Sequence, residues 1–107
     1  MKIQHDDSTA GAKGFVEKNI TAKIHTITAF VDEKTGECLT RLDFGYTTGC
    51  WRIHGFNAGY RGEGPTGLAW LLDKFGIAYR PEDIYSGRNA RTRGGYRIFS
   101  FGKYPVN

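Results

Sequence analysis

A glycine-rich loop that carries an arginine directly precedes a predicted helix in the segment Gly59–Leu72. The four glycines of this loop are Gly59, Gly62, Gly64 and Gly67. Glycine lets the backbone approach a ligand closely, and the N–H groups and dipole of a following helix favour negative charge, above all phosphate. With the cation of Arg61 added, the segment predicts a phosphate site. The alternative interpretation is that the glycines only make a tight turn from a strand into a helix.

The loop matches neither of two common nucleotide-binding motifs. A P-loop ends in Gly-Lys-Ser or Gly-Lys-Thr, and the dinucleotide fingerprint requires a parallel βαβ unit with an acidic residue downstream. Because the sequence shows neither pattern, it argues against a nucleotide-hydrolysing or Rossmann-type enzyme.

A second group of arginines lies near the end of the chain and consists of Arg88, Arg91 and Arg93. Arginine grips phosphate or carboxylate bidentately and stacks on aromatic rings. The charge of the chain is uneven, since Arg52–Asn107 contains nine Lys/Arg against four Asp/Glu, a balance of +5, whereas Met1–Trp51 contains six against seven. These arginines predict an anion-binding loop, and the alternative is a solvated, mobile hairpin tip.

Signals for catalysis or metal binding are weak. His54, Asp43, Cys50 and Glu63 could supply a base or a nucleophile, but no motif links them. The two cysteines, Cys38 and Cys50, have a spacing that fits neither a zinc module nor a redox motif, and we expect two reduced thiols. We therefore predict no catalytic residue, no metal ligand and no cofactor.

The helix after the glycine loop has signals at both ends. Pro65 fits the first helical position, and Gly76 fits the position that ends a helix. One face carries apolar residues at three- and four-residue spacing, namely Leu68, Leu71, Leu72 and Phe75.

Strand-like runs surround this helix. The run from Ile20 to Asp32 changes phase, which suggests a bulge, and the turn at Glu33–Glu37 predicts a hairpin with a returning strand. A third strand contains Trp51 and Ile53, and residues Tyr96 to Phe101 form a closing strand.

The resulting β-β-β-α-β order predicts an α+β fold, in which one amphipathic helix packs on one face of a small antiparallel sheet. We expect residues 1–18 to be a flexible N-terminal arm and residues 19–107 to form a single ligand-binding domain. One helix would leave Phe30, Trp51, Phe99 and Phe101 partly uncovered, so we also expect a homo-oligomer. No apolar run approaches a membrane span and no signal peptide opens the chain, which predicts a cytoplasmic protein without membrane contact.

The segment Gly59-Tyr60-Arg61-Gly62-Glu63-Gly64-Pro65-Thr66-Gly67-Leu68, in a small β-rich chain that ends with an arginine loop, resembles phage-encoded proteins that counter bacterial immunity. It is similar to the anti-Thoeris sponge family, which sequesters cyclic ADP-ribose-type signals. The resemblance implies a homo-oligomer in the host cytoplasm that holds the signal between protomers without cleaving it.

We therefore expect the chain to bind and sequester a phosphorylated small molecule of nucleotide type. Arg61 and the later arginines would meet phosphates, and Tyr60, Trp70 or Tyr96 would stack on a base. The predicted ligand-binding residues are Tyr60, Arg61, Gly62, Gly64, Thr66, Trp70, Arg88, Asn89, Arg91 and Arg93. Two alternatives are a small nucleic-acid-binding module and an inhibitor that contacts a protein through the arginine-rich loop. Whether the two basic segments share one pocket stays open at this point.

Overall fold

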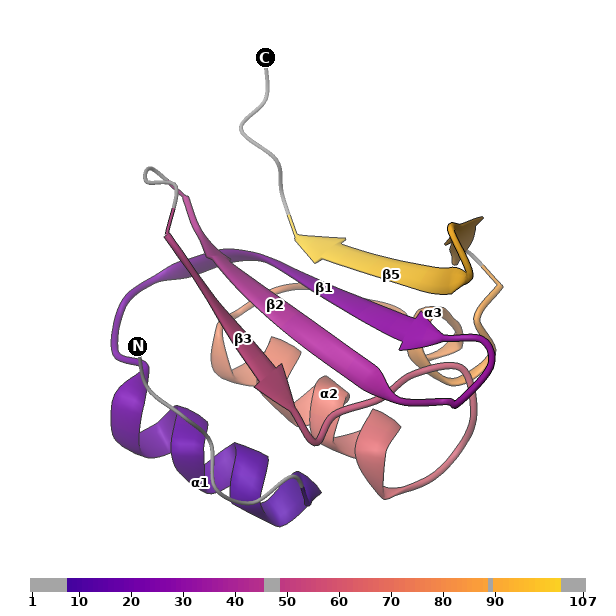
Figure 1. Cartoon of the computed structure of the whole chain (residues 1–107). Helices are drawn as coiled ribbons and strands as arrows, with labels where there is room; N and C mark the ends of the chain where they lie inside the picture. The colour runs from indigo at the N-terminus through magenta and orange to yellow at the C-terminus, as the bar shows by residue number, and fades with distance from the viewer. Residues whose placement is uncertain (1–7, 46–48, 89, 103–107) are drawn as a thin grey trace.

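The computed structural model describes residues 8–45, 49–88 and 90–102. Five antiparallel strands form one sheet in the order β3-β2-β1-β5-β4, and three helices lie on one of its faces (Figure 1). In chain order the elements are α1 (Thr9–Asn19), β1 (Ile24–Asp32), β2 (Cys38–Phe44), β3 (Cys50–His54), α2 (Glu63–Lys74), α3 (Pro81–Tyr85), β4 (Arg91–Arg93) and β5 (Tyr96–Gly102). The fold is α+β, as predicted.

The core lies between the sheet and the helices. Cross-strand neighbours share a face of the sheet, and one such row joins Ile53, Thr40, Ala29 and Phe99 across four strands. All four are buried. On α2 the predicted leucine stripe faces this layer, because Leu68, Leu71 and Leu72 are all fully buried.

The N-terminal segment corrects one prediction, because residues 9–19 form helix α1 rather than a flexible arm. Ser8 caps the helix by accepting a hydrogen bond from the Gly11 N–H at 3.0 Å. Ala12 and Val16, four residues apart, are fully buried, and Phe15 meets Trp51 of β3 edge to face with ring centroids 5.7 Å apart. Helix propensity alone did not indicate α1, because most of the stability of such a short helix comes from packing. Residues 1–7 of the expected arm lie outside the described residues.

The predicted β-elements are confirmed with small changes. The turn at Glu33–Glu37 joins β1 to β2. The phase change in the first run corresponds to a register shift between Ile24 and Thr26 where β1 pairs with β2.

Helix α2 begins at Glu63, two residues before Pro65, with Gly62 at its N-cap. A further short helix, α3, begins at Pro81.

The arginine-rich segment also differs from its prediction as a loop, because Arg91–Arg93 form edge strand β4. Gly94 and Gly95 connect β4 to β5, with φ of +61° and +85°. Two consecutive residues with positive φ make the two-residue hairpin turn that fits the twist of antiparallel strands.

The expectation of a homo-oligomer rested on aromatic side chains that a single helix would leave uncovered. Because α1 and α2 together cover the inner face, Phe99 and Phe101 are buried within the chain itself. Among the described residues, no helix is both long enough and apolar enough to cross a membrane.

Candidate functional site

The predicted phosphate site at the start of α2 is poorly suited to an anion. Pro65 has no N–H, and the Thr66 N–H already donates to the Gly62 carbonyl oxygen at 3.1 Å. The N–H groups of Gly62, Glu63 and Gly64 are therefore left outside the hydrogen bonds of the helix itself. The Glu63 carboxylate stands in the same first turn and would repel a phosphate.

The glycines of this loop are explained by close packing. A Cβ on Gly62 would lie 2.8 Å from the Tyr60 ring, and one on Gly64 would lie 2.8 Å from the Asn57 Cβ. A Cβ on Gly67 would collide with the Thr9 methyl group, and Gly59 has a φ of +93°. The geometry thus favours the tight-turn interpretation of the glycine-rich loop.

The side chain of Arg61 extends from the glycine-rich loop toward α3 and stacks on Tyr85. Its guanidinium carbon lies 5.1 Å from the centroid of the Tyr85 ring, and the Tyr85 hydroxyl donates to the Thr66 hydroxyl at 3.4 Å. Arg61, Pro81, Glu82, Tyr85 and Ser86 line a hollow of about 450 Å³.

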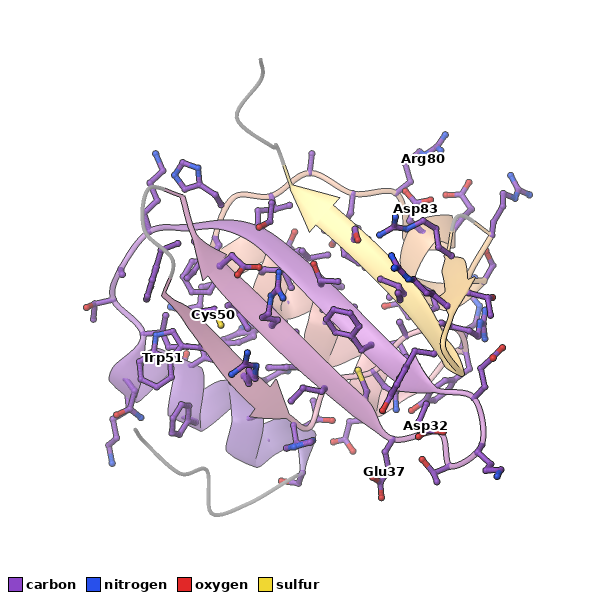
Figure 2. The ribbon with its side chains drawn as sticks, turned by 45° about the horizontal axis from the view of Figure 1, so that its top comes forward. Asp32, Glu37, Cys50, Trp51, Arg80 and Asp83 are labelled. Atoms are coloured by element: carbon purple, nitrogen blue, oxygen red, sulfur yellow. The ribbon has the colours of Figure 1, made fainter. Side chains whose placement is uncertain are left out.

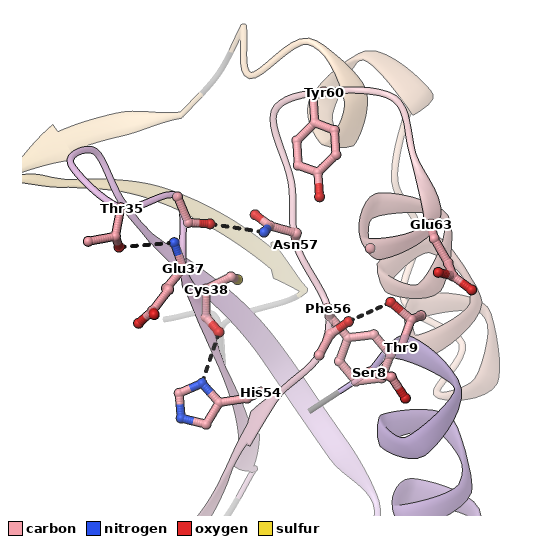
Figure 3. A pocket seen from close by; sticks show the side chains of 13 residues that line it. Ser8, Thr9, Thr35, Glu37, Cys38, His54, Phe56, Asn57, Tyr60 and Glu63 are labelled. Atoms are coloured by element: carbon pink, nitrogen blue, oxygen red, sulfur yellow. Dashed lines mark hydrogen bonds between the residues drawn. The ribbon is translucent and has the colours of Figure 1, made fainter. Parts of the chain in front are cut away.

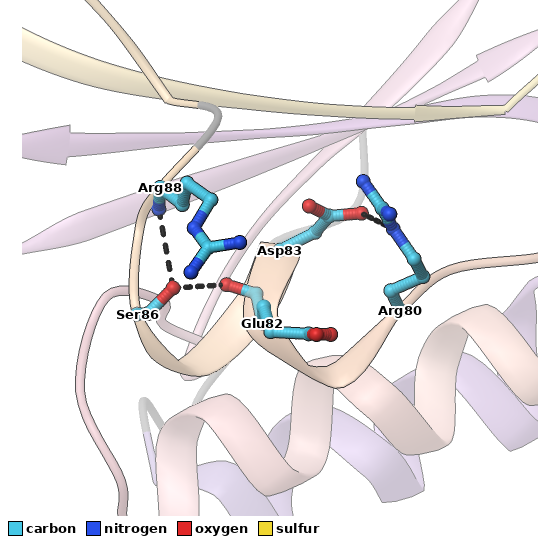
Figure 4. Close-up of polar contacts among 5 residues, drawn as sticks. All are labelled: Arg80, Glu82, Asp83, Ser86 and Arg88. Atoms are coloured by element: carbon cyan, nitrogen blue, oxygen red, sulfur yellow. Dashed lines mark hydrogen bonds and ion pairs between the residues drawn. The ribbon is translucent and has the colours of Figure 1, made fainter.

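Arg88 reaches the same region through its backbone, since its N–H donates to the Ser86 hydroxyl oxygen at 3.3 Å (Figure 4). We call Arg61, Glu82, Tyr85, Ser86 and Arg88 the α3 corner. Arg61 and the backbone of Arg88 both reach this corner, but Glu82 lines the same hollow as Arg61, and its negative charge reduces the attraction of the hollow for an anion.

Arg97 of β5 fills the space between the glycine loop and the segment after α3. Added Cβ atoms on Gly59 and Gly87 would both contact its guanidinium group. This group also lies 5.3 Å from the centroid of the Phe99 ring. Arg97 therefore joins two loops and serves the fold.

Arg91 and Arg93 lie on a different surface from Arg61. Arg91 pairs with Ile98, and Arg93 pairs with Tyr96. Because directly paired residues point to the same side of a sheet, both arginines project from the face opposite the helices. The predicted arginines thus occupy two surfaces, and Asn89 lies outside the described residues.

We name the sheet face opposite the helices the open face; Figure 2 shows it turned toward the viewer, with the helices behind. Its central row, given by the strand register, runs from Leu39 through Phe30 to Ile98 and Arg91. The next row pairs Arg52 with Arg41. A hollow of about 300 Å³ on this face is lined by Phe30, Leu39, Arg41, Arg52 and Tyr96.

The charges of the open face are predominantly positive. Arg41 forms an ion pair with Asp43, with Nε and Oδ2 3.0 Å apart. The Asp32 carboxylate accepts hydrogen bonds from the N–H groups of Lys34 and Thr35, at 2.8 and 3.2 Å. No ion pair among the described residues involves Arg52, Arg91 or Arg93. These last three arginines, all exposed, are available to an anionic ligand.

A groove of about 750 Å³ lies beyond one end of the sheet, between the β1–β2 turn and the starts of α1 and α2 (Figure 3). The Tyr60 hydroxyl points into it. Among the described residues, the lining includes Glu37 and Glu63 but neither lysine nor arginine. Several of their polar groups already bond within the protein, such as the Thr9 hydroxyl, which donates to the Gly55 carbonyl oxygen at 2.7 Å. The groove is therefore unsuited to phosphate.

The remaining predicted residues are dispersed. Trp70 lies near Lys13 of α1 and Lys74 of α2, whose Nζ atoms are 5.5 and 5.9 Å from its ring centroid.

Cys50 and His54 are four residues apart on β3, which corresponds to about 13 Å along a strand. They are too far apart to act as a nucleophile and a base on one atom. Within the described residues, no group of three or more His, Cys, Asp or Glu side chains could hold a metal ion.

Sequence reasoning missed Phe30, Arg41 and Arg52 as candidate ligand-binding residues. For Arg41 and Arg52 the signal was the alternation in β2 and β3, where both are out of phase with the buried Leu42 and Ile53. This alternation indicates a ligand-binding face only once the helices are known to cover the opposite face.

Comparisons of this chain with protein-family models, with curated proteins and with solved structures found no match.

Proposed function

We propose that the chain binds a phosphorylated ligand of nucleotide type on the open face and releases it unchanged. The observation that carries this proposal is the hollow in which the arginines Arg41 and Arg52 meet the aromatic residues Phe30 and Tyr96. Arginine forms charge-assisted bonds with phosphate, and an exposed aromatic ring offers a surface on which a base stacks.

The exposure of these groups supports binding. Tyr96 is 43% exposed, so its ring has area to offer a base. Phe30 and Leu39 are half-buried beside it and make an apolar floor. Each arginine contact to phosphate is worth about 1.5–3 kcal/mol, and a stacked base adds about 1–3 kcal/mol. Two such contacts with one stacked base therefore sum to about 4–9 kcal/mol, and the upper end of this range corresponds to micromolar affinity.

We propose binding rather than catalysis because the four candidate catalytic groups do not converge on one site. Of these groups, Asp43 and Cys50 are paired at one end of the open face, whereas His54 lies at the far end of β3 and Glu63 on α2. We also propose that the protein acts in the cytoplasm, where the free thiols of Cys38 and Cys50 stay reduced.

A ligand panel with matched variants tests this proposal. Thermal shift and calorimetry would be run with AMP, ADP-ribose, NAD, cyclic ADP-ribose isomers and cyclic dinucleotides. Each bound ligand would then be recovered and its mass determined by mass spectrometry. We expect an intact ligand whose affinity falls about tenfold or more in Arg52→Ala and in Tyr96→Ala. Arg61→Ala, which removes a charge at the α3 corner, is the control and should bind normally.

Two results would overturn the proposal. Loss of binding in Arg61→Ala with normal binding in Arg52→Ala would move the site to the α3 corner. Recovery of a cleaved product would replace binding by catalysis.

A further inference from the structure

We infer that the natural ligand of the open face is a single-stranded nucleic acid that lies across the strands. This inference rests on the proposed function and narrows it from nucleotide-type ligands in general to a polymer. It depends on how far apart the arginines stand, on the aromatic centre between them and on the charge of the face.

The arginines span the whole width of the sheet. Arg52 is on β3 and Arg91 is on β4, the two edge strands in the order β3-β2-β1-β5-β4. Four strand spacings separate these edges, which is about 19 Å. A mononucleotide in the hollow beside Arg52 cannot reach Arg91, whereas a chain of phosphates can contact both.

The centre of the face favours unpaired bases. Phe30, Ile98 and the exposed Tyr96 lie between the arginine-bearing edges. A base can lie on these side chains only when it is free of a duplex, because bases inside a helix are already stacked. A single strand offers both the phosphates and the accessible bases that this face requires.

Charge argues against a second copy of the chain as the occupant. In a two-fold symmetric contact the same patch meets itself. The unpaired Arg52, Arg91 and Arg93 would then be buried close to one another, with only the already engaged Asp32 and Asp43 as acidic groups of these rows. A polyanion neutralises these charges instead.

The test is fluorescence anisotropy with labelled oligodeoxythymidines of two, six and twelve residues and with a duplex of twelve pairs. The span of about 19 Å between the edge arginines is beyond the reach of a two-residue strand. A six-residue strand reaches it even at the close spacing of about 3.4 Å per nucleotide of a stacked strand. We therefore expect the six-residue strand to bind at least tenfold more tightly than the two-residue strand, with little further gain at twelve residues. We expect the duplex to bind at least tenfold more weakly than the twelve-residue strand.

Variants locate the contact. Arg52→Ala and Arg91→Ala change opposite edges, and each should weaken binding of the six-residue strand about tenfold. Only Arg52→Ala should weaken binding of AMP. Arg80→Ala is the matched control, since Arg80 is exposed and forms an ion pair with Asp83 on α3 (Nε to Oδ2 3.7 Å).

The outcomes separate the inference from the proposed function. If AMP binds through Arg52 but the six-residue strand binds no tighter, the nucleotide-binding function stands and the inference is wrong. Equal binding of the duplex also overturns the inference. If light scattering shows a dimer that Arg52→Glu or Arg91→Glu disrupts, and no oligonucleotide binds, the occupant is a second copy. Failure of both mononucleotides and oligonucleotides to bind overturns the proposed function and the inference together.

Discussion

At the scale of single residues, the arginines of this chain have separate tasks. Arg97 packs between Gly59 and Gly87, and Arg61 stacks on Tyr85. Arg41 is paired with Asp43, and Arg52 is exposed on the open face. The same side chain therefore stabilises the fold at some positions and is available to a ligand at others, depending on what lies within reach.

The two cysteines permit a prediction at the same scale. Burial raises the pKa of the Cys38 thiol from 9.0 to about 11, although the nearby Thr40 hydroxyl lowers it in part. Cys38 should resist a thiol reagent at pH 7.5 until the protein unfolds, while the half-buried Cys50 reacts first. In Cys50→Ser the fast phase should disappear; a fast phase that persists would contradict the burial of Cys38.

The same group gives a pH dependence of stability. In the unfolded chain the thiol loses its proton at a lower pH than in the folded protein. The free energy of unfolding should therefore be insensitive to Cys38 below about pH 9 and should fall as the pH rises toward about 11. Urea titrations of Cys38→Ala and of the parent protein across this range measure the difference.

At the scale of elements, the contact between α1 and α2 depends on a glycine. A Cβ added to Gly67 would collide with the Thr9 methyl group and would crowd the Phe56 ring at 3.0 Å. Gly67→Ala should therefore destabilise the protein by about 1–3 kcal/mol through overpacking. Gly14, in the middle of α1, has open space around it, and Gly14→Ala should stabilise by about 0.5–1 kcal/mol through helix propensity.

Chemical denaturation of both glycine variants gives these values. Both substitutions add the same methyl group to a helix. Changes of opposite sign in the free energy of unfolding would therefore isolate the packing effect at Gly67. Equal effects in both variants would contradict the close contact between the helices.

At the scale of the whole molecule, the two faces of the sheet differ in kind. Helices α1 and α2 bury the inner face, while the open face carries Arg52, Arg91 and Arg93 outside any ion pair among the described residues. Binding of a single strand should therefore depend on salt. Three phosphate contacts predict that log K falls against log salt concentration with a slope of about −2.

Anisotropy titrations between about 50 and 200 mM potassium chloride, a range over which counterion release changes affinity strongly, test this prediction. Replacing one of these three arginines by alanine should reduce the slope by about 0.7. A slope near zero would show that the arginines do not contact phosphate.

The sequence by itself determined the elements whose signals are local. The leucine stripe and Gly76 defined α2, the turn at Glu33–Glu37 defined the first hairpin, and these runs together indicated an α+β fold. In the last strand, Phe99 and Phe101 alternate with Ile98 and Ser100, a pattern that depends only on neighbouring residues. Such signals can be read because periodicity and turn chemistry depend on residues near one another in the chain.

Only the tertiary structure decided α1, the placement of the arginines and the candidate site. Helix α1 depends on packing against Trp51 and α2, which are remote in sequence. Arg61 and Arg91 belong to separate surfaces because Arg61 turns onto α3 while β4 pairs with β5. Phe30, Arg41 and Arg52 come from the consecutive strands β1, β2 and β3, and Tyr96 joins them because β5, from the far end of the chain, pairs with β1. Which face the helices leave open is a property of long-range packing, and no local pattern records it.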